Sequence, residues 1–308
     1  MQNTFQQTIN HAVTFEGIGL HSGKNCKVKL IPSEPDQGVI FKRTDLLNNN
    51  IVKANFQNVS SARLCTTLEN THGAKVSTVE HLLAAFYITG VDNVIVEIDS
   101  SEVPIMDGSS KDFMNIINNS GIKIQNVKRK YLKILDKVEL EDNGRLISIV
   151  PHNTDFEVNF QLNYSNKIIG NQKNIVNFSK DNLEDVYSSR TFCLYEDIEK
   201  IKKNGLAKGG SLDNAIVVDE KKVINENGLR NEKEFVNHKI LDLAGDFLLS
   251  GYRIIGKVKC YQGGHQLSNI FLNKLLTQKS CYTEISFNNI EIKKKPKTNQ
   301  DIRLAAIA

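Results

Sequence analysis

Three ionisable side chains recur at intervals of about one helical turn in the second half of the 308-residue chain. They are His238, Asp242 and Asp246, spaced i, i+4 and i+8 in a segment that is otherwise mostly apolar. On a helix, side chains at these intervals lie on one face. The stripe either faces solvent or has partners such as a metal ion, because burying unpaired charge is costly. The spacing alone leaves both interpretations open.

A second histidine lies beside a carboxylate in the first half, where Glu80 precedes His81 before an apolar run. An isolated Glu-His pair is usually a surface feature. Together with His238 and Asp242, however, it supplies two histidines and one carboxylate, and three protein ligands with an open fourth position are typical of catalytic zinc. A neighbouring glutamate is the usual general base in metalloproteases. The combination favours metal-assisted hydrolysis with one Zn²⁺ per chain, and Fe²⁺ suits the same ligands.

A third histidine follows two glycines in Gly263-Gly264-His265, directly after a segment that reads as a strand. Glycines let the backbone approach a ligand closely. A cationic imidazole there could stabilise an oxyanion or protonate a leaving amine. Asp246 is a candidate partner that would raise the pKa of this imidazole. The alternative interpretation is a histidine in a surface loop.

Two similar sets of elements are expected to position these residues. In the first half, residues 78–89 are predicted to form a helix that is capped by Ser77 or Thr78, ends at Gly90 and precedes a strand at 93–98. In the second half, a helix at 232–250 ends at Gly251 and precedes a strand at 252–261. Each helix carries a histidine in its first turns. Further strands are expected at 27–31, 38–41, 131–139, 145–150 and 157–164, with one or two short strands within 59–75 and a helix at 111–120.

The shared order of elements predicts two α+β domains of similar topology, with a site between them. The chain turns basic and polar around residues 125–130, so we expect a first domain at 1–126 and a second at 127–308. Two segments look inserted, at about 60–75 and about 194–220. The second contains a helix-like stretch at 195–203, a glycine-rich turn at 205–210 and a strand at 215–218. Insertions beside a site usually shape the substrate pocket.

Composition excludes some classes of function. The chain is 40% apolar and 24% charged, and its net charge of +4 is too small to indicate a nucleic-acid partner. The five cysteines form no C-x-x-C pair, which favours reduced thiols in a cytoplasmic protein. The N-terminus lacks the apolar core of a signal peptide, and no apolar run approaches the ~20 residues of a membrane helix. A basic run, Lys293 to Lys297, is expected to be a solvated tail.

Short motifs spread in order over nearly the whole chain resemble those of bacterial UDP-3-O-acyl-N-acetylglucosamine deacetylases, the zinc amidases at the committed step of lipid A synthesis. The motifs are Gly17-Ile18-Gly19-Leu20-His21-Ser22-Gly23, Ser77-Thr78-Val79-Glu80-His81-Leu82, Pro104-Ile105-Met106-Asp107-Gly108-Ser109, Ser189-Arg190-Thr191-Phe192, Gly209-Gly210-Ser211, His238-Lys239 with Asp242 and Gly245-Asp246, and Gly264-His265. Any one of these motifs is weak evidence, whereas the ordered set is specific.

The resemblance implies a β-α-α-β sandwich, in which each domain is a small mixed or antiparallel sheet with two helices. It implies that three residues bind zinc, namely His81, His238 and Asp242. Glu80 would deprotonate the water that attacks the amide. His265 would protonate the leaving amine, with Asp246 tuning it.

The resemblance also implies contacts with an acylated UDP-sugar, the expected small-molecule partner of a monomeric enzyme. Thr191 would bond near the scissile carbonyl, Lys239 would meet the diphosphate and Phe192 would border the sugar. An apolar passage for the acyl chain is expected in the insert at 194–220. Its candidate lining residues are Ile198, Ala207, Ser211 and Val217, and the further substrate-binding candidates are Leu20, Cys65 and Gly210.

Some matching positions are assigned structural roles, and one position departs from the family. His21 and Asp107 match the motifs and are expected to be structural, and a structural role is also favoured for Cys65 over a catalytic one. Gln262 stands where the family has lysine or arginine, so no phosphate contact is assigned to that side chain.

Two rival functions remain open from the sequence. A non-haem iron oxygenase could use the same three ligands, but its usual β-barrel-like fold disagrees with a ligand set on two helices. A non-enzymatic nucleotide-sugar binder would keep the pocket but lose the metal ligands or the base. Glu80, His265 and all three ligands are present, which argues against the binder.

Overall fold

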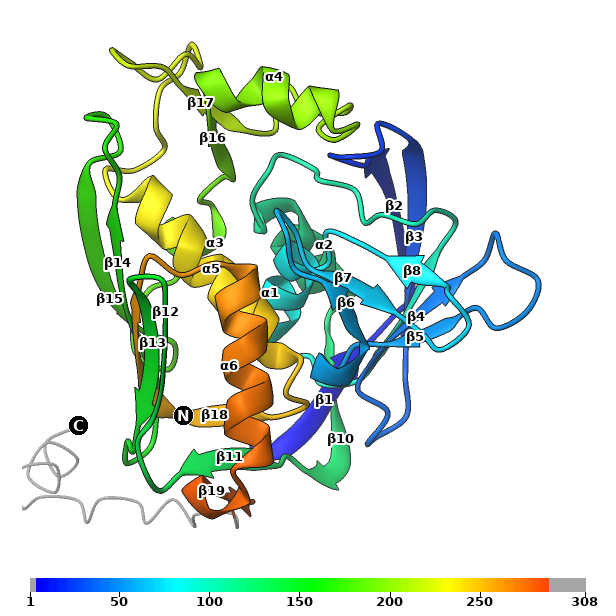
Figure 1. Ribbon diagram of the computed structural model, residues 1–308. Helices are drawn as coiled ribbons and strands as arrows, with labels where there is room; N and C mark the ends of the chain where they lie inside the picture. Colours follow the sequence, from blue (N-terminus) through cyan, green and yellow to red (C-terminus); the bar gives the residue numbers. More distant parts are fainter. Residues whose placement is uncertain (1–3, 288–308) are drawn as a thin grey trace, which may run out of the picture.

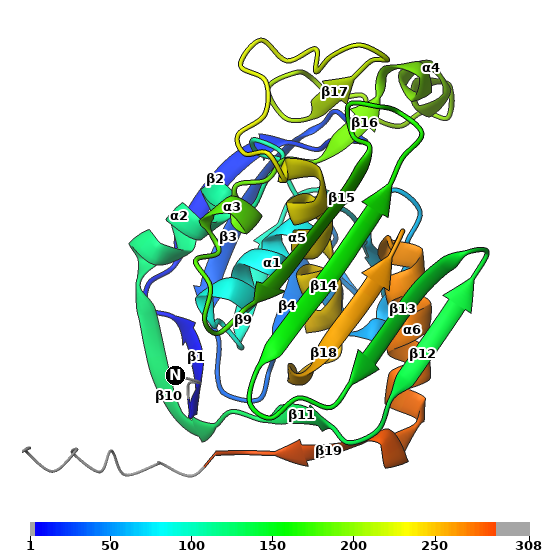
Figure 2. The same ribbon diagram turned by 90° about the vertical axis from the view of Figure 1, so that its left-hand side faces the viewer.

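The computed structural model describes residues 4–287, so the basic run at 293–297 lies outside the described part of the chain. Two sheets enclose a layer of helices between them (Figures 1 and 2). This arrangement confirms the predicted α+β fold with helices sandwiched between sheets. Among the described residues, no helix has both the length and the apolar character needed to traverse a bilayer.

The elements of the first half run from β1 to β10. They are β1 (Phe5–Ile9), β2 (Val13–Ile18), β3 (Asn25–Pro32), β4 (Val39–Arg43), β5 (Ile51–Lys53), the short 3₁₀ helix η1 (Phe56–Asn58), β6 (Val59–Ser61), β7 (Thr67–Glu69), β8 (Lys75–Val76), α1 (Glu80–Thr89), β9 (Val94–Ile98), α2 (Lys111–Ser120) and β10 (Ile122–Lys128).

The elements of the second half run from β11 to β19. They are β11 (Tyr131–Ile134), β12 (Val138–Asp142), β13 (Arg145–Val150), β14 (Phe156–Asn163), β15 (Asn171–Asn177), α3 (Glu184–Tyr187), β16 (Phe192–Leu194), α4 (Tyr195–Lys203), β17 (Ile216–Val218), α5 (Glu234–Leu248), β18 (Arg253–Tyr261), α6 (His265–Thr277), η2 (Lys279–Cys281) and β19 (Tyr282–Ile285).

The two main sheets repeat one topology. The first has the order β2-β3-β9-β4-β5, with β9 antiparallel to β3 and parallel to β4. In the second sheet β18 is antiparallel to β13 and parallel to β14, and the outer strands β12 and β15 pair antiparallel as β2 and β5 do. In both halves the strand that follows the histidine-bearing helix therefore lies at the centre of the sheet. The similar topology predicted from the order of elements is confirmed, and the domain boundary at residue 126 stays a prediction.

Alternation in the sequence explains which face of each sheet is buried. In β3, Cys26, Val28 and Leu30 point inward, while the lysines between them are exposed. Helix α1 is buried from Glu80 to Tyr87, and α5 is buried along nearly all of its length. A helix that is enclosed on all sides has to be mostly apolar. The few ionisable side chains on these two helices therefore need polar or charged partners, because burying them unpaired is energetically costly.

Gly245 sets the closest approach of α1 and α5. A methyl group at this position would overlap the carbonyl oxygen of Glu80 and would lie 2.9 Å from its carbonyl carbon and 3.1 Å from the backbone nitrogen of Ala84. The backbone of α5 therefore rests directly on the first turn of α1. Because that turn also carries His81, Gly245 helps to fix the distance between the histidines of the two helices.

We expect Gly245→Ala to destabilise the protein by about 1–3 kcal/mol, the cost typical of overpacking. The sign is informative, because alanine normally favours a helix over glycine by about 1 kcal/mol. Urea unfolding measures the change. Gly264→Ala is the control, because Gly264 has an extended backbone and no described residue has an atom within 4 Å of an added methyl group. Equal stability of Gly245→Ala and the wild type would contradict the tight helix crossing.

The predicted cap of the first helix is wrong. The helix begins at Glu80, its N-cap is Val79, and no side chain in the described part of the chain caps it. Thr78 instead donates its hydroxyl to Glu102 at 3.0 Å, and the Ser77 hydroxyl donates to the Ser101 carbonyl. Both candidate caps thus bond to residues 101–102 instead of to the helix. The local sequence around the helix does not reveal these distant partners.

The strand predicted at 131–139 is also wrong as one element, because the chain forms two strands there, β11 and β12. Residues 135 and 136 instead bond through their backbone N–H groups to the Cys281 carbonyl. Strand β11 pairs with β18 and β19, whereas β12 pairs with β13. Because of this break, the two halves of the predicted strand pair with different neighbours in the same sheet.

Candidate metal centre and surrounding site

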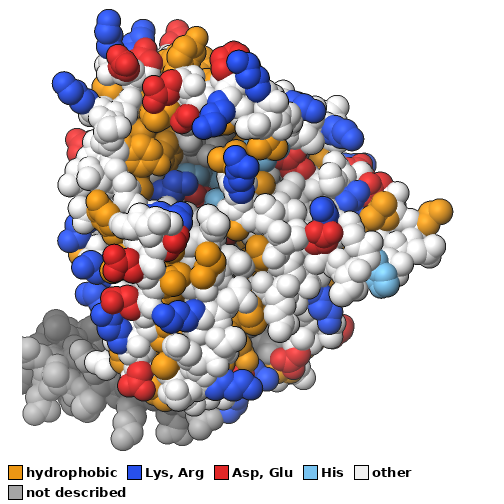
Figure 3. Space-filling model, in the orientation of Figure 1, with side chains coloured by type: hydrophobic (Ala, Val, Ile, Leu, Met, Phe, Trp, Pro, Cys, Tyr) orange, Lys and Arg blue, Asp and Glu red, His pale blue; other side chains and the backbone are white. Residues whose placement is uncertain are grey.

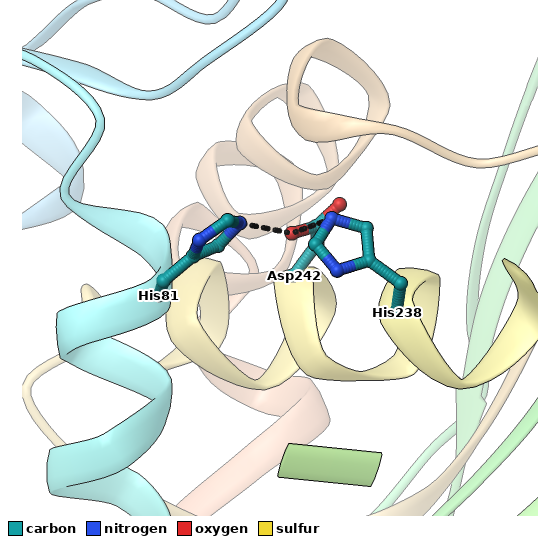
Figure 4. A group of neighbouring side chains, drawn as sticks. All are labelled: His81, His238 and Asp242. Atoms are coloured by element: carbon teal, nitrogen blue, oxygen red, sulfur yellow. Dashed lines mark ion pairs between the residues drawn. The ribbon is translucent and has the colours of Figure 1, made fainter. Parts of the chain in front are cut away.

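Three side chains converge between the helices α1 and α5. Figure 4 shows His81 on α1 facing His238 and Asp242 on α5. Asp242 Oδ1 lies 3.5 Å from His81 Nε2 and 3.3 Å from His238 Nε2. One ligand atom from each residue lies within 4.8 Å of the other two. The residues are 1–4% exposed, so the solvated-stripe interpretation is excluded.

The donors of this cluster fit a metal ion. Asp242 Oδ1 is buried and has no hydrogen-bond partner among residues 4–287, although it lies between two imidazoles. A neutral imidazole nitrogen without a proton and a carboxylate oxygen are both electron-pair donors. Buried polar atoms normally have partners, so a bare cluster of such atoms is unfavourable. A divalent cation among the three atoms satisfies them at once, and two histidines with one carboxylate are a set that zinc accepts.

The backbone orients His238. Its Nδ1 lies 3.1 Å from the Ser189 carbonyl oxygen, so this nitrogen carries the proton and Nε2 faces the cluster. Burial lowers the pKa of His238 to about 3, which keeps the imidazole neutral and able to bind metal. Such a carbonyl partner is a common support for metal-binding histidines.

A buried ion pair fixes the segment that supplies this carbonyl. Arg190 donates through Nε to Glu234 Oε1 at 2.8 Å, and its backbone N–H donates to the same oxygen at 3.1 Å. Glu234 is fully buried on the first turn of α5. The pair ties residues 189–192 to the helix that carries His238. Arg190 therefore has a structural role, which is to hold the segment that contains Thr191 and Phe192 against α5.

Glu80 lies beside the cluster with its carboxylate directed at the third histidine. Its Oε1 is 3.6 Å from His265 Nε2, and its Oε2 accepts the Thr66 backbone N–H at 3.0 Å. Burial raises the pKa of Glu80, while the nearby His265 and His81 work in the opposite direction. A carboxylate with a raised pKa is suited to accept a proton near neutral pH.

His265 is the first residue of α6 and is 8% exposed, so the surface-loop interpretation is excluded. Its Nδ1 lies 2.9 Å from Asp246 Oδ2. Burial by itself lowers the pKa of His265, but the carboxylates of Asp246, Glu80 and Asp242 outweigh burial and raise it to about 10. The imidazole is therefore cationic at neutral pH and can donate a proton from Nε2.

Lys239 and Phe192 also lie beside the cluster. Lys239 Nζ donates to Asp242 Oδ2 at 2.9 Å and lies 5.3 Å from the centre of the Phe192 ring. Burial opposes the charge of Asp242, but the surrounding His238, Lys239 and His265 hold its pKa well below the usual range. The carboxylate therefore stays ionised, as a metal ligand requires.

An apolar cavity of about 280 Å³ lies beside the site, under the inserted segment. Figure 3 shows a hollow in the upper part of this face, with histidine and lysine side chains in its depth and hydrophobic side chains around it. Strands β16 and β17 pair in parallel, and both contribute residues to the wall of this cavity. The cavity lining includes Leu20, Thr191, Phe192, Ile198, Ala207, Gly210, Ser211 and Val217. These are eight of the residues that the sequence placed around the substrate.

Two predicted substrate residues do not line this cavity. Cys65 is buried with its thiol 3.9 Å from the Thr67 hydroxyl, and burial raises the pKa of this thiol to about 12. Lys239 instead lies beside the cluster of His81, His238 and Asp242, where it donates to Asp242. A direct contact of Cys65 with substrate in this cavity therefore has no support from the geometry.

The inserted segment is fastened to the first half of the chain. The Gly209 N–H donates to the Leu20 carbonyl at 3.0 Å, and the Lys208 N–H donates to the His21 carbonyl at 3.3 Å. A methyl group at Gly209 would overlap the carbonyl oxygen of Gly19, so only glycine permits this approach. The motifs at 17–23 and 209–211 are thus two sides of one contact that closes the cavity.

The first glycine-rich motif binds an internal carboxylate. Glu102 accepts the backbone N–H groups of His21 and Ser22, both at 2.7 Å. These amides are therefore occupied and not free for a phosphate. The ring of His21 lines the cavity, and its two nitrogens are buried and have no hydrogen-bond partner in the described structure. Asp107 pairs with Arg230 at 2.8 Å.

The side chain of Gln262 is also occupied. Its Oε1 accepts the Asn163 backbone N–H at 2.9 Å, and its Nε2 donates to the Asn163 carbonyl. A neutral amide that is bonded twice to the neighbouring strand has no positive charge to offer. The geometry therefore agrees with leaving Gln262 out of the phosphate contacts.

Two residues that sequence reasoning missed support the site directly. Thr66 bonds to Glu80 through its N–H and to Asp246 through its hydroxyl, at 3.0 and 2.7 Å. Ser189 orients His238 through its carbonyl oxygen. All three contacts join residues that are distant in the sequence, and two of them use backbone atoms of Thr66 or Ser189, which every residue type possesses. Membership of Ser189 in a motif was the only available signal.

Comparison with known proteins agrees with the site. Residues 6–277 match the protein family described as UDP-3-O-acyl N-acetylglycosamine deacetylase. The chain is 41% identical over 284 residues to the UDP-3-O-acyl-N-acetylglucosamine deacetylase of Citrifermentans bemidjiense, covering 92% of each protein. It is 39% identical over 289 residues to the protein of that name from Pasteurella multocida, covering 92% of this chain and 94% of the relative.

Proposed function

The chain belongs to the UDP-3-O-acyl-N-acetylglucosamine deacetylase family, and from that premise we propose that it removes the N-acetyl group from this acylated UDP-sugar. The products are acetate and the free amine, and the reaction commits the sugar to lipid A synthesis. The observation that carries the proposal is the buried, unpartnered Asp242 Oδ1 between two imidazoles. This cluster has the donors of a catalytic metal site, and an acid and a base lie beside it.

His81, His238 and Asp242 are proposed to hold one Zn²⁺, and Fe²⁺ suits the same donors. When bound, such an ion polarises the amide carbonyl and lowers the pKa of a water molecule toward 7. The neutral imidazole of His238 and the ionised carboxylate of Asp242 are already in the forms that bind metal. The Ser189 carbonyl supports this state by accepting a hydrogen bond from the Nδ1–H of His238, which leaves Nε2 without a proton.

Glu80 and His265 divide the proton transfers. Glu80 takes a proton from the attacking water, because its carboxylate is buried beside the cluster and does not belong to the ligand set. His265 is cationic, so its Nε2 proton can offset charge on the carbonyl oxygen and then pass to the leaving nitrogen. Asp246 holds Nδ1 at 2.9 Å and stabilises the cation. Thr191, which lines the cavity beside the cluster, is proposed to bond near the scissile carbonyl.

The rest of the substrate is assigned to the two sides of the site. The acyl chain is proposed to occupy the apolar cavity, with Ile198 and Val217 among its contacts. Phe192 is proposed to border the sugar, and Lys239 above its ring is proposed to meet the diphosphate. Lys239 is a point charge on a flexible stem, so it can exchange part of its contact with Asp242 for a phosphate oxygen.

We expect Val217→Phe to raise KM for a long-chain substrate about 10-fold, because excluding two methylene groups from an apolar cavity costs about 1.6 kcal/mol. Val217 is 7% exposed on β17 and lines the cavity, so a larger ring projects into it. Kinetics with long-chain and short-chain UDP-sugars measure the effect. The short-chain substrate is the internal control, and its KM should change less than about 2-fold. An equal rise for both substrates would contradict an acyl site in this cavity.

Acetate release distinguishes hydrolysis from the two rival functions. A deacetylase releases one acetate per UDP-3-O-acyl-N-acetylglucosamine without oxygen or an added cosubstrate, whereas an oxygenase depends on both. A binding protein retains the substrate without converting it. We further propose that the protein acts as a cytoplasmic monomer, and sedimentation at assay concentration tests the second part of that statement.

A further inference from the structure

Thr66 joins the carboxylates of Glu80 and Asp246 through two different atoms. Its backbone N–H donates to Glu80 Oε2 at 3.0 Å, and its hydroxyl donates to Asp246 Oδ1 at 2.7 Å. The hydroxyl is the donor because an ionised carboxylate can only accept. Thr66 is 2% exposed, and both hydrogen bonds are buried. In such an environment a hydrogen bond to a charged group is strong, and its loss is costly.

The two contacts close a ring of four residues. Asp246 Oδ2 lies 2.9 Å from His265 Nδ1, and His265 Nε2 lies 3.6 Å from Glu80 Oε1. Thr66 therefore links Asp246, the partner of the proposed acid His265, to the proposed base Glu80. With Oδ1 held by the hydroxyl, the carboxylate plane of Asp246 is fixed so that Oδ2 faces the imidazole.

The ring connects segments that are distant in the sequence. Thr66 immediately precedes β7 in the small three-stranded sheet of the first half, Glu80 begins α1, and Asp246 is on α5. The Thr66 carbonyl also accepts the Val79 N–H at 3.4 Å, so the backbone of residue 66 is tied to the start of α1. The hydroxyl is therefore presented to α5 from a fixed position.

We propose that Thr66 is a positioning residue for the reaction, whose hydroxyl orients Asp246 and thereby His265 while its N–H holds Glu80. This inference rests on the proposed function. Thr66 is neither one of the three proposed metal ligands nor part of the cavity lining, so its effect would pass through Glu80, Asp246 and His265. Removing the hydroxyl should loosen the imidazole but leave the three metal ligands and the acyl cavity unchanged.

Thr66→Val tests the inference, because it removes the hydroxyl and keeps the shape of the side chain and its N–H. We expect kcat for acetate release to fall about 10-fold, the loss typical of an outer hydrogen-bond partner. KM should stay within about 2-fold, with metal content unchanged. Thr66→Ser retains the hydroxyl and should recover kcat to within about 3-fold of the wild type. Thr67→Val is the matched control, because Thr67 is the neighbouring threonine and its hydroxyl lies 3.9 Å from the Cys65 thiol instead of contacting a carboxylate of the site.

A double-mutant cycle with Asp246→Ala tests the route of the effect. If Thr66 acts through Asp246, adding Thr66→Val to Asp246→Ala should lower kcat less than about 2-fold further. Wild-type kcat in Thr66→Val, failure of serine to rescue, or full additivity in the cycle would each overturn the inference while leaving the proposed function intact. Absence of acetate release from the wild type would overturn the proposed function and this inference with it.

Discussion

Replacing Glu80 with alanine should lower kcat at least about 100-fold while one metal ion per chain is retained. The reason is the division of roles within one turn of α1. His81 faces the ligand cluster, whereas Glu80 faces His265 and the Thr66 N–H. Loss of the carboxylate removes the base that accepts a proton from water. It does not remove any of the three donors that bind the metal.

Glu80→Gln separates the charge of this residue from its size. Glutamine fills the same space and can still meet the Thr66 N–H, but it cannot accept a proton, so we expect a similar loss of kcat. Glu34→Ala is the matched control, because Glu34 is an exposed glutamate of the first half and should leave kcat unchanged. Metal analysis accompanies each kinetic measurement. A variant that loses the metal, or that changes only KM, would show that Glu80 is a ligand or a binding residue instead of the base.

Replacing His265 with alanine should also lower kcat at least about 100-fold, the scale of one general acid. The carboxylates around His265 outweigh burial and raise its pKa to about 10, so the wild-type imidazole is charged at neutral pH. Alanine removes both this charge and the proton for the leaving amine. Asp246→Asn should cause a smaller loss, because the imidazole remains but its charge is less well stabilised.

The controls for His265 use the other histidines of the chain. His72→Ala changes an exposed histidine in the turn before β8 and should leave kcat unchanged. His238→Ala removes a proposed ligand and should lower metal content, which His265→Ala should not. If His265→Ala lost metal to the same extent, His265 would be a ligand. If it kept wild-type kcat, the leaving amine would have another proton donor.

Much of the fold was predictable because its signals are local. Alternation of apolar residues identified strands such as β3 and β9. Gly90 is the C-cap of α1 as predicted, whereas α5 ends at Leu248, three residues before Gly251. The repeated order of strand, histidine-bearing helix and strand predicted two sheets of similar topology. The errors at the start of α1 and at residues 131–139 arose where distant chain segments, around 102 and 281, supply the hydrogen bonds.

The site was predictable to a different degree for different residues. The i, i+4 spacing predicted that His238 and Asp242 lie on one helix face. His81 was added because two histidines and one carboxylate form a typical zinc ligand set, and because it belongs to a family motif. Thr66 could not be found, because its role depends on how β7 meets α5 in space. Cys65 was placed at the substrate by similarity, whereas its thiol is buried outside the cavity lining. Its neighbour in sequence, Thr66, makes the contacts that reach the site.

The most direct test of the account is to measure metal content and acetate release together on the purified protein, before chelation, after chelation and after Zn²⁺ is restored. We expect about one metal ion per chain, loss of acetate release on chelation and recovery on adding Zn²⁺. His81→Ala should reduce both quantities in parallel. Acetate release that persists after the metal has been removed, or a protein that binds no metal, would contradict a metal-dependent deacetylase built on His81, His238 and Asp242.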